Sequence, residues 1–286
     1  MPLSLPKQLS AFAHAYILES VDSVSASAQL EQLAQILLCQ NNNGQLQQPC
    51  QTCHSCSLFA AQNHPDFLSN DREQNSIGVD EVRQVSEFLT KTAQLSGNQV
   101  VLLHQVEKMT ENASNALLKT LEEPTAKSYL LLSCENKAQL LPTILSRCQF
   151  LTLPKQSKEE LLSSYSDIPD YLIGFSKGAV SKLEHWQQSE TALEAFSEVY
   201  QGFIAWLKHQ TPDFALAELV TPDSELTDFL LYLISRRLYQ LGIKQNENTW
   251  QAQTLLNQYQ NSTRKALGVN QTLALNSLLA ELRVLI

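Results

Sequence analysis

The chain has 286 residues, with 20 Lys and Arg against 29 Asp and Glu, so its formal net charge is −9 and its pI is near 5.2. This length predicts about two or three domains, and 43% hydrophobic against 17% charged residues excludes a disordered chain. The excess of acidic residues argues against a protein that binds nucleic acid by itself. The presence of only 8 Gly argues against an enzyme with several glycine-rich phosphate loops.

The first half of the chain alternates between short apolar runs and helical patterns. Runs at residues 15–18, 100–103 and 129–132 predict buried strands, and weaker runs at 66–68 and 150–153 are further candidates. The helical faces between them are Leu30, Leu33, Ala34, Leu37 and Leu38, then Val79, Val82, Val85 and Leu89, then Ala113, Ala116, Leu117 and Leu121. Strands that alternate with helices predict an α/β domain, a parallel sheet with helices on both faces.

The second half has helical patterns only. Apolar residues recur at helical spacing in three long blocks, which begin near Ala192, Leu226 and Leu275. We therefore expect a small all-α domain followed by an all-α bundle. The three Trp residues lie among these helical residues and are expected in the core: Trp186, Trp206 and Trp250.

No targeting or membrane segment is expected. The first residues are too polar and too rich in Pro for a secretory leader, and no apolar run approaches about 18 residues. Four of the 6 Cys cluster, which in a chain without a leader favours metal binding over disulfides. The expected location is the cytoplasm.

The cysteine cluster predicts a structural zinc site. Cys50, Cys53 and Cys56 follow one another at two-residue gaps, and Cys39 ends the first predicted helix. Four thiolates complete a zinc tetrahedron and leave no open position, so the site is expected to be structural rather than hydrolytic. Two alternatives remain open at this point: His54 replaces one of the thiols, or Cys39 is a buried core thiol and the others are free.

Several motifs in the first 152 residues occur in the order that bacterial clamp-loader subunits of DNA polymerase III have. The chain resembles this family of AAA+ proteins, which also carries an inserted four-Cys zinc module. The residues that carry the resemblance are His64-Pro65-Asp66-Phe67, Gly78-Val79-Asp80-Glu81-Val82-Arg83, Asn115-Ala116-Leu117-Leu118-Lys119-Thr120-Leu121-Glu122-Glu123-Pro124 and Ile144-Leu145-Ser146-Arg147-Cys148.

The chain departs from the family at both parts of the ATP machinery. Residues 19–28, which follow the first strand, contain no Gly and no Lys and carry Glu19 and Asp22, so a triphosphate is expected to be repelled. The Asp-Glu pair that binds Mg²⁺ in the family corresponds to His104 and Gln105 here. We therefore expect no bound ATP and no intrinsic ATPase activity, in a subunit of a DNA-directed DNA polymerase holoenzyme.

The resemblance implies the rigid, non-ATPase stator subunit of a five-subunit ring, whose partners are delta and three gamma/tau subunits. It assists ATP-dependent loading of the sliding clamp onto primed DNA, with weak or indirect contact to the clamp. Arg147 matches the family's arginine finger, which acts in trans on a neighbouring ATPase subunit. The simpler interpretation of Arg147 is a surface Arg that pairs with helix C-terminal carbonyls.

The implied domains are a degenerate nucleotide-binding domain at 1–152 with the zinc module at 39–56, a helical lid at 153–205, and a collar for oligomerisation at 206–286. Two other functions stay open. One is an ATP-binding gamma/tau-like ATPase with an atypical phosphate loop, and the other is a free-standing nucleic-acid-binding zinc protein. His64 and His104 are expected to be structural histidines with satisfied hydrogen bonds.

Overall fold

The computed structural model describes residues 8–42, 44, 48–70, 74–95, 97–153, 156–242, 247–265 and 270–285. Residues 1–7, where the sequence predicts no leader, lie outside these ranges. The chain divides into two compact units: Met1–Leu161 with Ser176–Lys182, and Leu162–Phe175 with Leu183–Ile286. The separate lid and collar boundaries stay predictions.

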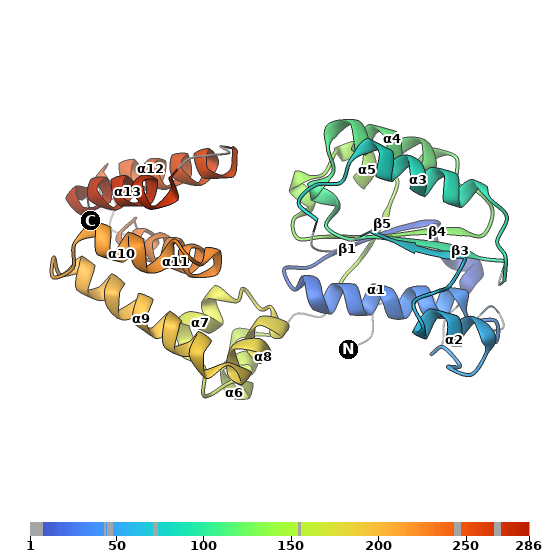
Figure 1. The fold of residues 1–286 in the computed structure, drawn as a ribbon, viewed down its shortest axis with the longest axis horizontal. Helices are drawn as coiled ribbons and strands as arrows, with labels where there is room; N and C mark the ends of the chain where they lie inside the picture. The colour runs from blue at the N-terminus through green and yellow to red at the C-terminus, as the bar shows by residue number, and fades with distance from the viewer. Residues whose placement is uncertain are drawn as a thin grey trace. The chain divides into compact units, whose positions relative to one another are not determined.

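The first unit is built on a parallel sheet of five strands in the order β2-β3-β4-β1-β5 (Figure 1). Its strands are β1 (Ala15–Glu19), β2 (Phe67–Ser69), β3 (Gln99–Leu103), β4 (Ser128–Cys134) and β5 (Gln149–Leu151). Its helices are α1 (Ser23–Leu38), α2 (His54–Ala60), α3 (Val79–Thr90), α4 (Glu111–Glu122) and α5 (Pro142–Leu145). All five strand candidates in the sequence are therefore confirmed.

Helices cover both faces of this sheet, as predicted. In Figure 1, α3 and α4 lie on one face and α1 on the other. The strands supply the two faces alternately: in β1, Ala15 and Ile17 join the core beneath α3 and α4, whereas Tyr16 and Leu18 join the core beneath α1. Near-continuous apolar strands are what a sheet buried on both faces requires.

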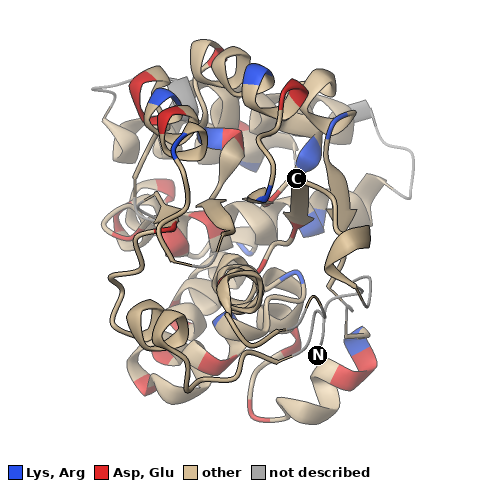
Figure 2. Ribbon diagram, turned by 90° about the vertical axis from the view of Figure 1, so that its right-hand side faces the viewer, with Lys and Arg blue, Asp and Glu red and all other residues tan. Residues whose placement is uncertain are grey.

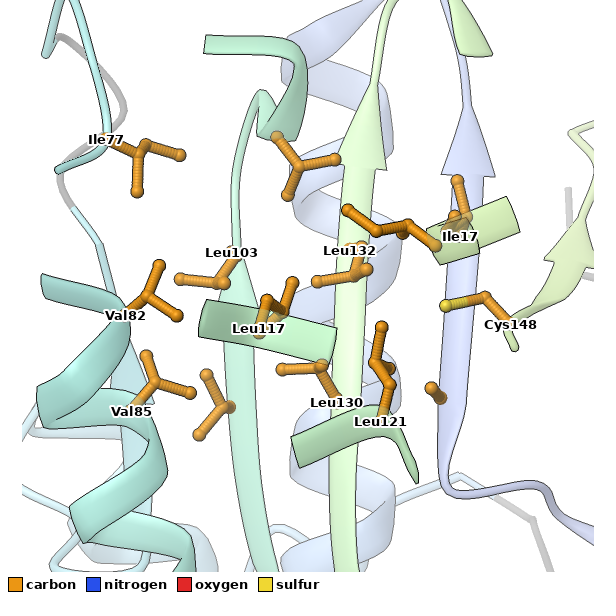
Figure 3. Packing of buried hydrophobic residues seen from close by; sticks show 14 of the residues in the cluster. Ile17, Ile77, Val82, Val85, Leu103, Leu117, Leu121, Leu130, Leu132 and Cys148 are labelled. Carbon is orange, nitrogen blue, oxygen red and sulfur yellow. The ribbon is translucent and has the colours of Figure 1, made fainter. Parts of the chain in front are cut away.

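One row of side chains crosses the middle of the sheet. Ile17 pairs in register with Leu132, and Leu132 pairs with Leu103. Leu117 and Leu121 of α4 belong to the same buried cluster as this row, and Figure 3 shows them beside it. Ile17 and Leu132 have no exposed surface, so the centre of the core is tightly filled.

Replacing Leu132 with Ala should destabilise the first unit by about 2–5 kcal/mol, because it removes buried surface and leaves a cavity. Hydrogen exchange of the sheet amides in increasing urea measures this loss. Val24→Ala is the matched control: its side chain is 60% exposed on α1, so the change should stay within about 0.5 kcal/mol. Equal effects of the two substitutions would contradict this packing.

The second unit contains helices only in its described residues. They are α7 (Asp170–Phe175), α9 (Glu190–Leu207), α10 (Asp213–Val220), α11 (Ser224–Gly242), α12 (Glu247–Lys265) and α13 (Gln271–Leu285), together with most of α8 (Val180–Gln188) and the end of α6 (Lys158–Ser164). None of the helices in the described part of the chain has the length and apolar character that a membrane span requires.

Aromatic rings form the centre of the second unit. Trp186 stacks on Phe175 at 5.7 Å and contacts Phe196 edge-on at 5.1 Å. Trp206 is also buried and donates a hydrogen bond from Nε1 to Asp213. The prediction for Trp250 is wrong, because its side chain is 73% exposed on α12. Helical spacing alone did not distinguish the buried face of this polar helix from its outer face.

Candidate functional site: a degenerate nucleotide pocket, an arginine and a cysteine cluster

The turn between β1 and α1 is where a nucleotide-binding relative would hold phosphate. Here β1 ends at Glu19 and α1 begins at Ser23, so the turn is too short for a glycine-rich loop. Asp22 is the N-cap of α1, and its carboxylate accepts a hydrogen bond from the backbone N–H of Ser25 at 3.0 Å. A carboxylate therefore occupies the end of the helix that a phosphate would need.

The end of β3 supplies no metal-binding carboxylate pair. His104 is buried, and its Nδ1 lies 3.0 Å from the hydroxyl of Ser27 on α1. Gln105 has a left-handed backbone (φ 53°), and its N–H donates to the Ser133 hydroxyl at 3.2 Å. His104 thus packs α1 against the sheet, and the prediction that it is a satisfied structural histidine is confirmed.

Arg147 lies between α5 and β5, and one residue, Cys148, separates it from β5. Its Nη2 lies 2.6 Å from a carboxylate oxygen of Glu122 at the end of α4, and its Nη1 donates to the carbonyl of Thr143 at 2.9 Å. The bond to Thr143 is the helix-end contact that the simpler interpretation of Arg147 predicts. Glu122 as an ion-pair partner is a residue that sequence reasoning missed, although it lies in the motif that ends in Pro124.

Arg147 and the turn between β1 and α1 lie at opposite ends of the parallel strands, and therefore at opposite edges of the sheet. Gln149 of β5 pairs with Tyr16 near the start of β1, so Arg147 lies beyond the amino ends of these strands. Asp22 follows the carboxyl end of β1. The strands separate the two positions, so Arg147 cannot serve the pocket of its own chain.

The four predicted zinc ligands come together. The Sγ atoms of the four cysteines all lie within 4.8 Å of one another: Cys39, Cys50, Cys53 and Cys56. Cys39 is the C-cap of α1, Cys53 is the N-cap of α2, and Cys56 lies inside α2. His54 is not part of the group, so among the described residues the structure favours the four-thiol set over the His54 alternative.

The surroundings of these sulfurs fit a thiolate site. The backbone N–H groups of Cys50 and Cys53 donate to the sulfurs of Cys39 and Cys50 at 3.5 and 3.3 Å. Backbone N–H groups of Thr52 and Cys53 lower the pKa of the Cys50 thiol to about 5, whereas burial raises the pKa of the Cys56 thiol to about 12, so without an ion Cys50 is the thiolate of the two. A zinc tetrahedron with bonds of about 2.3 Å has sulfur–sulfur edges of about 3.8 Å, so a small contraction of the cluster would close it around an ion.

A chain of buried polar groups also joins the cysteine module, formed by the end of α1 and by α2, to the sheet. Ser55 on α2 donates from its hydroxyl to the carbonyl of Leu38 at 2.7 Å, and the same hydroxyl lies 2.7 Å from Nε2 of His64. Nδ1 of His64 accepts from the backbone N–H of Asp66 at 3.1 Å. His64 is thus a satisfied structural histidine, as predicted, and joins the module to the start of β2.

Lys, Arg, Asp and Glu all occur along the described ribbon in Figure 2, and the formal net charge of the chain is −9. Exposed cations are partly compensated locally: Arg83 pairs with Asp80 at 2.9 Å, and Lys137 pairs with Glu19 at 3.1 Å. A continuous track for the phosphate backbone of DNA needs clustered cations, whereas each of these two cations has a carboxylate partner.

Comparisons with known proteins agree with the fold. A family described as "DNA polymerase III, delta subunit" matches residues 6–157. DNA polymerase III subunit delta' of Haemophilus influenzae is 36% identical over 67% of this chain and 58% of its own length, and that of Escherichia coli is 33% identical over 73% and 68%. The chain thus spans less than two thirds of the first of these relatives.

A solved structure, the DNA polymerase III gamma subunit-related protein of Thermotoga maritima, has a TM-score of 0.51 and 19% identity, with 96% of each chain covered. This likeness supports the fold alone. The family match covers more than half of the chain, and the relatives that align with it share the name delta prime. The chain therefore belongs to the DNA polymerase III delta subunit family, among its delta prime members.

Proposed function

We propose that the chain is a non-catalytic, stator-type subunit of the DNA polymerase III clamp loader. It joins delta and gamma/tau subunits in a ring and assists ATP-dependent loading of the sliding clamp onto primed DNA. Its contact with the clamp itself is weak or indirect. Family membership supports this role, because the relatives with this name are subunits of DNA polymerase III.

One observation carries the proposal furthest: the arginine and the pocket lie at opposite edges of the same sheet. The pocket has no phosphate loop, and its helix end is capped by Asp22. Arg147 is held at the surface, with a third of its side chain exposed, where a neighbouring subunit can approach it. A guanidinium placed in this way serves a neighbour's γ-phosphate, where it stabilises the charge that develops during hydrolysis.

The cysteine cluster holds a structural Zn²⁺ in this proposal. Cys39, Cys50, Cys53 and Cys56 supply four sulfur ligands, which leave no open position for a water or a substrate. The metal would therefore contribute folding free energy to the module formed by the end of α1 and by α2, and no step of ATP hydrolysis.

Reconstitution with purified delta and gamma/tau subunits tests the function. We expect the isolated chain to bind no fluorescent ATP analogue, and the complex to load the clamp onto primed DNA only when the chain is present. Micromolar nucleotide affinity with turnover by the isolated chain would instead favour the gamma/tau-like ATPase. A mobility shift of DNA by the isolated chain that weakens steeply with salt would favour the nucleic-acid-binding zinc protein.

A further inference from the structure

The Asp22 side chain does more than cap α1. It is buried, with 7% of its surface exposed. On its own helix it accepts the Ser25 N–H at Oδ1 (3.0 Å) and the Ser25 hydroxyl at Oδ2 (2.8 Å). These two bonds satisfy the first turn of α1, in the way that Asp commonly caps a helix.

Two further donors reach the same carboxylate from a residue 159 positions later in the sequence. The backbone N–H of Ser181 donates to Oδ2 at 3.0 Å, and its hydroxyl donates to Oδ1 at 2.6 Å. Ser181 lies in the first turn of α8 and belongs to the segment Ser176–Lys182, which packs as part of the first unit. Each carboxylate oxygen thus accepts two hydrogen bonds, one from each serine.

Two other helix caps in the described part of the chain show only contacts within their own helix. The Thr110 side chain caps α4 by accepting from Ala113 at 3.2 Å, and the Ser189 side chain caps α9 by accepting from Ala192 at 3.3 Å. Both contacts stay within one helical turn. Half of the Asp22 bonds, by contrast, come from α8.

The donors around Asp22 are those that proteins use for phosphate. They are backbone N–H groups at helix N-termini, where the helix dipole favours an anion, together with hydroxyl groups. Burial by itself raises the pKa of Asp22, but the hydrogen bonds from Ser181 and Ser25 outweigh it and hold the pKa below its ordinary value. The carboxylate is therefore ionised at neutral pH.

We propose that Asp22 is a built-in anion that takes the place of a nucleotide phosphate between the first turns of α1 and α8. It holds Ser176–Lys182 against the first unit without any ligand, and it denies this position to the phosphates of ATP. The inference deepens the proposed non-ATPase function and rests on it for the comparison with nucleotide-binding relatives.

Asp22→Asn tests the tether, because it keeps the shape of the side chain, removes its charge and turns one acceptor into a donor. We expect amide exchange in residues 176–182 to become at least about tenfold faster in the full-length chain, since opening this segment would no longer break charged hydrogen bonds. Ser181→Ala should act similarly, and the double variant should exceed either single variant only slightly. Asp80→Asn, in the exposed first turn of α3, is the control and should leave these amides unchanged.

Asp22→Gly tests whether a phosphate ion can occupy the position of the Asp22 carboxylate. Gly is tolerated at a helix N-cap and leaves space beside Ser25 and Ser181. Inorganic phosphate should then slow exchange in residues 176–182 of this variant but not of the wild type, with chloride at equal ionic strength as the control. Absence of this rescue would overturn the phosphate-replacing role, and unchanged exchange in Asp22→Asn would overturn the tether. Both readouts use the isolated chain, so they are independent of whether the clamp loader assembles.

Discussion

A clamp loader assembled with the Arg147→Ala chain should hydrolyse one ATP fewer in its first rapid turnover. An arginine finger is worth roughly 10³–10⁵ in rate, or about 4–7 kcal/mol of barrier, at the single site that it serves. The family implies three gamma/tau sites, so a rapid burst of about three ATP per complex should fall to about two. The site that lacks the arginine should react at least about 10³-fold more slowly.

The ion pair with Glu122 does not prevent this role. The two side chains are 33% and 49% exposed, and exposed pairs of this kind contribute about 0–1 kcal/mol. A bidentate contact with the developing charge of a γ-phosphate is several times stronger, so the guanidinium can exchange one partner for the other. In the proposed role, the ion pair with Glu122 orients Arg147 before a neighbour binds.

Rapid-quench measurement of the burst, with DNA and clamp present, checks the prediction. Arg83→Ala is the matched control, because Arg83 is also an exposed arginine in an ion pair, with Asp80 at 2.9 Å. It should leave the burst at its wild-type amplitude. A wild-type burst from an assembled Arg147→Ala complex would rule out the finger.

Removal of zinc should unfold the module around α2 and leave the sheet folded. Structural zinc sites in small peptides have apparent binding free energies of about 10–16 kcal/mol, so the module cannot offset the loss by its small apolar core. The protein should contain one zinc per chain. After chelation, amide exchange in residues 48–60 should rise strongly, while exchange in β3 and β4 stays slow.

The remaining cysteines provide an internal control for the zinc experiment. Burial raises the pKa of the Cys134 and Cys148 thiols to about 12, so they stay protonated and unreactive in the folded chain. A thiol reagent should modify four cysteines after chelation and all 6 only after unfolding. Cys53→Ser should lose the metal, and Cys148→Ser should keep it. Full zinc content in Cys53→Ser would contradict the four-sulfur site.

The sequence alone predicts the structural features that depend on residues close together in the chain. Each strand of the sheet coincides with an apolar run in the sequence. Cys50, Cys53 and Cys56 are close in the chain, so their spacing already predicts that their sulfur atoms lie near one another. Trp250 shows the limit of this reasoning: the helical period of α12 is real, but the face that packs depends on tertiary contacts. Periodicity predicts that a helix has an inner side without always telling which side it is.

Contacts between distant residues were beyond sequence reasoning. The sequence predicts that the carboxylates of residues 19–28 repel a triphosphate. It does not predict the contact with Ser181, because this serine lies 159 residues from Asp22 and belongs to no motif. The pairing of Glu122 with Arg147 joins two motifs that the resemblance treats separately. Such contacts follow from the topology of the sheet, which brings the ends of different elements together.

The two unlike edges of the sheet give the proposed assembly a direction. In a row of similar ATPase subunits, each member would complete the site of one neighbour and have its own site completed by the other. In the proposed function this chain offers its arginine on one side, and at the opposite edge the Asp22 carboxylate occupies the place that a phosphate would need. In the proposed ring, the series of ATPase sites would end at this chain. The chain would therefore mark one unique position in an otherwise repetitive ring.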